Sequence, residues 1–299
     1  MPLKITRASD QIEVKQITLT IYSPPGLGKT SMGFTAADPL LFDFDRGAYR
    51  SQFRKDSVQI ETWTDVDGLA IEDLAAYKTV IVDTAGRALD SLSTALMVKN
   101  PKFKGFGGQL TLQGFGALKA AFIGWLKLLH SAGKDVVLIA HMDEQKDGDT
   151  MLERLDITGG SKAEIYKVAD AMGRIKMHGG QRTFNMNPTD TAFGKNPAQL
   201  PVLQIPDYNK EPHFLAGVIQ TIKDKLNESS EAALAETARI RELRESFEHF
   251  EDADAFTKQV AKMAKAQPKD KTLLVEVAAA KGFIFDKAAK AFKASGASA

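Results

Sequence analysis

The sequence predicts an α/β fold with a mostly parallel sheet and a C-terminal helical appendage. Residues 79–82 and 136–140 are short apolar runs typical of strands, residues 40–44 are a further predicted strand, and these segments alternate along the chain with helix-like segments. Strands that are apolar throughout are covered by helices on both faces, which favours parallel pairing. A glycine-rich loop follows a further predicted strand at 17–22 and precedes a predicted helix at 30–37, which Pro39 ends.

Composition limits the classes of protein that fit. The 299 residues suffice for a large α/β domain with an appendage, and 43% hydrophobic residues support a substantial core. The net charge of +1 does not by itself demand nucleic acid or a membrane, so any basic surface must be local. With no cysteine, the chain has no disulfide, thiolate metal site or cysteine nucleophile. No apolar run approaches the roughly 20 residues of a membrane span, and the start lacks a signal-peptide pattern, so we expect a cytoplasmic protein without membrane contact.

The glycine-rich loop has the pattern of a phosphate-binding loop. It comprises Ser23, Pro24, Pro25, Gly26, Leu27, Gly28, Lys29, Thr30 and Ser31. It departs from the pattern GxxxxGK[ST] only at Ser23, where the pattern has glycine. Its backbone N–H groups are expected to surround a β-phosphate, with Lys29 reaching the β- and γ-phosphates and Thr30 binding Mg²⁺. The alternative is a Gly-Pro turn that happens to precede a lysine.

Three of the predicted strands end in ionisable residues, which parallel strands bring to the same edge of a sheet. Asp83 follows the strand 79–82 and is the expected Mg²⁺-site carboxylate, although it could instead cap a helix. Asp43 and Asp45 end the strand 40–44, and one of them is a candidate base for the attacking water. His141 ends the strand 136–140 and is a candidate sensor of the γ-phosphate; a structural role is equally open.

The remaining elements are predicted from periodicity and turn residues. A short strand at 57–61 precedes a helix at 65–76, and 112–131 has one apolar face of a helix. Residues 171–178 and 181–187, joined by two glycines, predict a hairpin that extends the sheet.

The core is expected to span residues 1–222, with a helical region at 223–299 in which no further strands occur. Residues 224–254 contain ten acids and four Lys or Arg, whereas 258–293 contain nine Lys and three acids. Acidic and basic helices that face each other explain this pattern, and a Lys-rich arm that contacts nucleic acid is the alternative.

The order SPPGLGKTS, FDFDRG, TVIVDTAG and VVLIAH over residues 15–222 resembles the RecA-like ATPase core. It is most similar to small phage-encoded proteins with a RecA/RadA core, some of which anneal single strands. The resemblance implies Mg²⁺-dependent ATP hydrolysis in a homo-oligomer, in the host cytoplasm if phage-encoded. A basic residue of the neighbouring subunit would complete each site: Lys195 matches best, and Lys162 and Arg174 match less well. Asp45 falls where RecA-like proteins have a catalytic Glu.

The resemblance also implies DNA recombination with single-stranded DNA as partner, through annealing or strand exchange. Lys102, Phe103, Lys104 and Phe106 lie in a glycine-rich loop after the Asp83 strand, where lysines can neutralise phosphates and aromatic rings can stack on bases. The segment 142–162 is a second, more acidic candidate. The alternative is that both are ordinary loops. A single-stranded-DNA-binding protein is a further candidate partner.

Two other classes remain open. Residues 83–87, DTAGR, match an element of signal-recognition-type GTPases, but no [NT]KxD sequence that would read guanine occurs in the chain. A module that uses ATP only for assembly, without significant turnover, also fits.

Overall fold

The computed structural model describes residues 10, 12–51, 53–157 and 161–295. Two compact units make up the chain. One unit is Val14–Leu226, and the other combines Asn227–Ala299 with Met1–Glu13.

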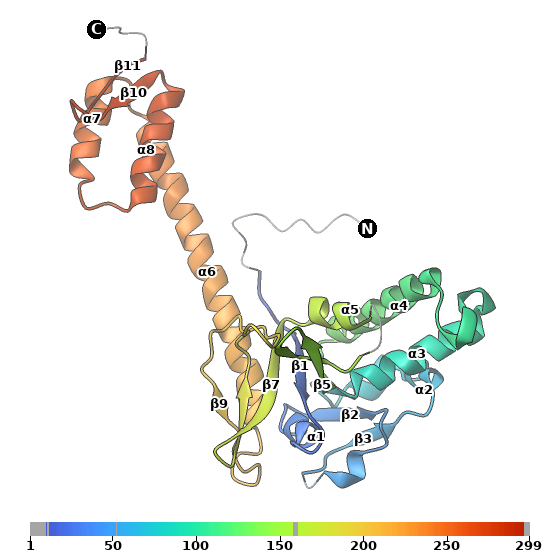
Figure 1. Ribbon diagram of the computed structural model, residues 1–299. Helices are drawn as coiled ribbons and strands as arrows, with labels where there is room; N and C mark the ends of the chain where they lie inside the picture. The colour runs from blue at the N-terminus through green and yellow to red at the C-terminus, as the bar shows by residue number, and fades with distance from the viewer. Residues whose placement is uncertain (1–9, 11, 52, 158–160, 296–299) are drawn as a thin grey trace. The chain divides into compact units, whose positions relative to one another are not determined.

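The first unit is built on a nine-stranded sheet, which confirms the predicted α/β fold (Figure 1). The strand order is β3-β2-β4-β5-β1-β7-β8-β9, and β6 pairs with β5 outside this path. The strands are β1 (Thr18–Ser23), β2 (Pro39–Asp43), β3 (Ser57–Gln59), β4 (Thr79–Asp83), β5 (Asp135–Asp147), β6 (Thr150–Leu155), β7 (Ala171–His178), β8 (Gln181–Asn185) and β9 (Leu203–Gln204). From β3 to β7 along the order, all neighbours are parallel. The carboxyl ends of these strands therefore lie at one edge.

Two hairpins extend this sheet. The predicted hairpin of β7 and β8 is confirmed, and β7 joins the sheet through parallel pairing with β1. Gly173 in β7 leaves room for the neighbouring strand, since a Cβ there would lie 2.4 Å from the Phe184 ring. β5, predicted to end at 140, runs on to Asp147 and pairs with β6. Polar residues on both faces conceal this hairpin from hydrophobic pattern analysis.

Helices cover both faces of the sheet. They are α1 (Lys29–Gly33), α2 (Trp63–Asp67), α3 (Ala85–Lys99), α4 (Leu112–Ser131), α5 (Ser161–Val168) and α6 (Phe214–Glu248). One apolar cluster joins α2, α3, α4 and α5 to the sheet, and α4 spans its predicted range. The other joins α1 and the first turns of α6 to the opposite face, through residues such as Leu215 and Ile222.

Two predicted helices are shorter than expected. The helix at 30–37 ends at Gly33, after which Thr35 Oγ1 donates a 2.6 Å hydrogen bond to the carbonyl of Met32. The helix at 65–76 is two pieces, α2 and a 3₁₀ helix at Ile71–Leu74. Each piece has its own N-terminal cap, because Asp65 and Asp73 accept hydrogen bonds from backbone N–H groups just before them.

The second unit contains the later part of α6, α7 (Ala253–Lys262) and α8 (Pro268–Ala280). It also contains a hairpin of β10 (Phe283–Asp286) and β11 (Ala291–Ala294), so the expectation of no strands after 223 is wrong. The hairpin forms because Phe283, Phe285 and Phe292 pack on a phenylalanine cluster around Phe256. In the described part of the chain, no helix combines the length and apolarity needed to cross a bilayer.

Candidate nucleotide site

The glycine-rich loop joins β1 to α1 at the carboxyl edge of the sheet, as predicted. Gly26 and Gly28 have φ of 83° and 82°, a left-handed conformation that side chains disfavour, and Gly28 forms the N-cap of α1. Lys29 is buried, and its Nζ donates to the carbonyl oxygens of Ser23 and Pro24, both at 3.0 Å. Burial lowers the pKa of Lys29 to about 8, against the opposing effects of Asp83 and Asp45. In the free protein the ammonium group of Lys29 is therefore bound by carbonyl oxygens of the loop. A bound phosphate would replace these oxygens as the hydrogen-bond acceptor.

Thr30, in the first turn of α1, and Asp83, at the end of β4, are in contact. Thr30 Oγ1 donates a 2.6 Å hydrogen bond to Oδ2 of Asp83, which ends β4. Burial raises the pKa of Asp83 to about 6, although the hydrogen bond from Thr30 lowers it. A hydroxyl and a buried carboxylate are the oxygen donors that Mg²⁺ takes beside a phosphate. The pair fits that ion, which would supply charge neutralisation at the phosphates when bound.

Asp43 and Asp45 have different hydrogen-bond partners and therefore different roles. Asp43 is buried, and its two carboxylate oxygens accept hydrogen bonds from the N–H groups of Gly47 at 2.9 Å and Ala48 at 2.8 Å. Those bonds hold the turn after β2 and leave Asp43 a structural role. Asp45 follows the strand end, with its N–H directed to the carbonyl of Asp83 at 3.2 Å.

The side chains of Asp45 and His141 lie next to each other and both line a polar cavity of about 660 Å³. His141 Nε2 lies 3.4 Å from Asp45 Oδ2, and Arg87 Nε lies 3.6 Å from Oδ1. The hydrogen bond with His141 is the main reason that the pKa of Asp45 is lowered. The Nδ1 atom of His141 is buried and has no hydrogen-bond partner among the described residues. The structure thus brings three predicted residues, Asp83, Asp45 and His141, to one edge with the loop.

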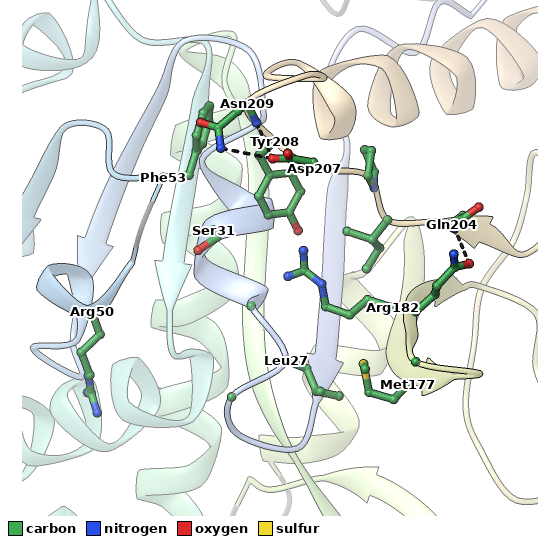
Figure 2. A pocket seen from close by; sticks show the side chains of 16 residues that line it. Leu27, Ser31, Arg50, Phe53, Met177, Arg182, Gln204, Asp207, Tyr208 and Asn209 are labelled. Atoms are coloured by element: carbon green, nitrogen blue, oxygen red, sulfur yellow. Dashed lines mark hydrogen bonds between the residues drawn. The ribbon is translucent and has the colours of Figure 1, made fainter.

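A second, larger cavity of about 880 Å³ is lined by the loop, by β8 and by residues 204–209, and is shown in Figure 2. Arg182 of β8 reaches over the loop, so a Cβ at Gly28 would lie 2.5 Å from its Nη1 atom. The guanidinium carbon lies 5.2 Å from the centre of the Tyr208 ring. Tyr208 is buried, and burial raises its pKa to about 12. The cavity therefore places a cation and an aromatic ring beside the phosphate-binding loop.

Sequence analysis missed Arg182 and Tyr208. Arg182 belongs to the hairpin predicted at 171–187, but only the pairing of β7 with β1 brings that hairpin beside the loop. The one available signal was an arginine on a strand that joins the sheet next to the loop strand. Tyr208 lies after the sheet, where no local pattern marks it.

The three basic residues that were predicted to act on the site of a neighbouring subunit do not line the nucleotide site of their own chain. Lys195 Nζ donates a 2.6 Å hydrogen bond to the carbonyl of Ala169, just before β7 begins and away from the carboxyl edge. Arg174 is buried, and its Nη1 atom donates a 3.1 Å hydrogen bond to the carbonyl oxygen of Asn187. Lys162 lies on α5. The role of Lys195 in a neighbouring subunit stays a prediction.

The predicted DNA loop lies between α3 and α4, at the far end of the pair that these helices form (Figure 1). Lys102 and Lys104 are exposed, and Phe106 is fully exposed. Phe103 differs, because it is half-buried and packs against the core. Only one of the two predicted rings is therefore free to stack on a base.

The glycine of the DTAGR element has a packing role. Gly86 lies within α3, where a Cβ would be 3.3 Å from the carbonyl oxygen of Asp156. β5, the strand after which signal-recognition-type GTPases have their guanine-reading loop, continues directly into its hairpin with β6. Neither feature supports the GTPase alternative, which stays a prediction that competition between ATP and GTP tests.

The loop, its buried lysine and the Thr30–Asp83 pair define a P-loop nucleoside triphosphatase. A family model described as an AAA domain matches residues 15–198, and the chain belongs to this family. The match supports a nucleotide-binding ATPase. A comparison with curated proteins found no match.

Proposed function

We propose that this protein is an Mg²⁺-dependent ATPase of RecA-like type that acts on single-stranded DNA as an oligomer, in strand annealing or exchange. The observation that supports this most is the loop between α3 and α4. There Phe106 is fully exposed two residues after Lys104, and Lys102 and Lys104 are exposed as well, so that a ring that can stack on a base lies close to cations that can neutralise phosphates. The loop is connected to the ATP site by α3, which begins at Ala85, two residues after Asp83.

The roles at the ATP site follow from the contacts of each side chain. Lys29 binds the β- and γ-phosphates once they replace the loop carbonyls as its partners. Thr30 and Asp83 hold Mg²⁺. Asp45 is proposed as the base that orients and deprotonates water, because its carboxylate faces a cavity and is not bound to backbone amides. His141 orients Asp45 and is positioned to respond when the γ-phosphate leaves.

ATP is the proposed substrate. The wide cavity beside the loop offers Tyr208 as an aromatic surface for the base and Arg182 as a cation for the phosphates or ribose. Competition of bound ATP by unlabelled GTP tests this preference. Tighter binding of GTP would contradict it.

The DNA partner is tested by measuring ATP turnover with and without a single-stranded oligonucleotide. We expect stimulation in wild type and its loss in the Lys104→Ala/Phe106→Ala variant, with basal turnover unchanged. The Lys127→Ala/Leu128→Ala variant is a matched control, because both residues are exposed further along α4. Basal turnover without any DNA stimulation of the wild type would support a stand-alone ATPase instead.

A further inference from the structure

The C-terminal unit has its own folded core. Phe247 of α6, Phe256 of α7, Leu274 of α8 and Phe292 of β11 are buried together. Thr257 Oγ1 accepts a 2.8 Å hydrogen bond from the N–H of Phe292, which fixes the hairpin on α7. The order is therefore three helices followed by an antiparallel hairpin, gathered around the phenylalanine cluster (Figure 1).

The acids of the Lys-rich segment are already neutralised within this unit. Residues 258–293 have nine Lys and three acids. Asp270 pairs with Arg239 at 2.6 Å, Glu276 with Arg244 at 3.6 Å, and Asp286 with Lys293 at 3.0 Å. These carboxylates therefore offset arginines and one lysine, and most of the lysine charge remains. The explanation that acidic and basic helices face each other accounts for only part of the pattern.

Several lysines have structural partners. Lys258 pairs with Asp254 at 2.6 Å and Lys269 with Glu236 at 2.5 Å. Lys271 and Lys281 donate to backbone carbonyl oxygens. Within residues 161–295, by contrast, an exposed set of lysines has no such partner: Lys262, Lys265, Lys287 and Lys290.

These four lysines occupy two turns. Lys262 and Lys265 lie at the end of α7 and in the turn before α8. Lys287 and Lys290 lie in the turn between β10 and β11, which Asp286 Oδ1 holds by accepting hydrogen bonds from the N–H groups of Ala288 and Ala289. Lys290 has a φ of 52°, a conformation that lysine rarely adopts and glycine or asparagine would adopt more easily. The hairpin thus presents two lysines on an ordered turn.

We propose that the C-terminal unit is a second nucleic-acid-binding module, which contacts the phosphates of duplex DNA with Lys287 and Lys290 of the β10–β11 turn. Its rings favour a duplex over single strands, because every phenylalanine of the unit is buried or half-buried and none is free to stack on an unpaired base. The module is distinct from the loop that carries Phe106 and does not depend on the ATP site. An anionic membrane is the competing partner for such lysines, but among the described residues of this unit the exposed large apolar side chains are only Ile12, Val275 and Ile284.

The test uses the full-length protein and a labelled blunt duplex, titrated by fluorescence anisotropy over a series of salt concentrations. The Lys287→Ala/Lys290→Ala variant is expected to bind the duplex more weakly and to reduce the slope of log affinity against log salt by about 2, since each lost phosphate contact contributes about 0.9. The matched control is Lys127→Ala/Lys210→Ala, two exposed lysines of the first unit. Far-ultraviolet circular dichroism and basal ATP turnover check that both variants are folded.

Three results would overturn the proposal. The first is equal duplex affinity and equal salt slope for the lysine variant and wild type. The second is an equal loss in the control variant. The third is a loss of binding to phosphatidylserine vesicles with duplex binding intact. Loss of single-strand stimulation in the Lys104→Ala/Phe106→Ala variant concerns the other loop, so the two proposals fail separately.

Discussion

Thr30 donates a 2.6 Å hydrogen bond to Asp83 across 53 residues of sequence. The bond connects the end of the phosphate-binding loop to the end of β4, although β5 lies between β1 and β4 in the sheet. Both side chains are oxygen donors at one edge, so the bond marks the place where Mg²⁺ would be held.

We predict that Asp83→Asn retains much of the affinity for nucleotide but loses Mg²⁺-dependent turnover. The amide keeps the shape and still accepts a hydrogen bond from Thr30, but it has no charge for the metal ion. A loss of kcat of at least about 100-fold is expected, the scale of removing one electrostatic contribution to the transition state. Steady-state phosphate release over a range of Mg²⁺ concentrations measures it. Wild-type kcat at saturating Mg²⁺ would remove Asp83 from the site.

The two neighbouring aspartates should respond differently to the same substitution. Asp45→Asn is expected to bind ATP and to lower kcat by roughly 10²–10⁴-fold, because an amide cannot take up a proton. Asp43→Asn should instead lower the free energy of unfolding by about 1–3 kcal/mol, since it weakens two bonds to backbone amides. Denaturant unfolding and kcat are measured on both variants. A larger loss of kcat from Asp43→Asn at unchanged stability would assign the base to Asp43.

The affinity for ATP should depend on pH through Lys29. The pKa of its amine is about 8 in the free protein, and phosphates stabilise the charged form, so the pKa of the bound state is higher. Well below pH 8 the amine is already protonated in the free protein, and the affinity is insensitive to this group. As pH rises above about 8, binding must take up a proton and the Kd increases. A Kd that stays constant from pH 7 to above pH 9, measured with a fluorescent ATP analogue, would contradict this.

Arg182→Ala should raise the Kd for ATP by about tenfold, equivalent to about 1.4 kcal/mol. Its guanidinium lies over Gly28, where the loop is expected to hold phosphate. Arg182→Lys should recover part of the loss because it keeps the charge without the planar fork. Binding of adenosine should change much less than binding of ATP. Arg241→Ala, at an exposed arginine of the other unit, is the control; equal losses for adenosine and ATP would assign Arg182 to the base instead.

The sequence predicts the parts of the site that are local in the chain. The strand before the loop, the loop itself and the apolar strand ending in Asp83 each have a pattern of their own, and the parallel sheet brings their ends together. Arg182 could not be placed this way, because its position depends on the pairing of β7 with β1. Asp43 and Asp45 could not be distinguished from the sequence. Only the folded turn shows that the N–H groups of Gly47 and Ala48 donate to the carboxylate of Asp43 and not to that of Asp45. The β5–β6 and β10–β11 hairpins were missed because one is polar on both faces and the other is short and alanine-rich.

The central claim is that the loop around Lys29 binds ATP for hydrolysis. Single-turnover release of phosphate from γ-labelled ATP, with Mg²⁺, tests it most directly in wild type and Lys29→Ala. Lys29 is the one buried amine that contacts the loop among the described residues, so the variant lacks the cation for the β- and γ-phosphates. We predict phosphate release by wild type and none above the uncatalysed rate by the variant. Equal release by both proteins, or none by the wild type, would contradict the account.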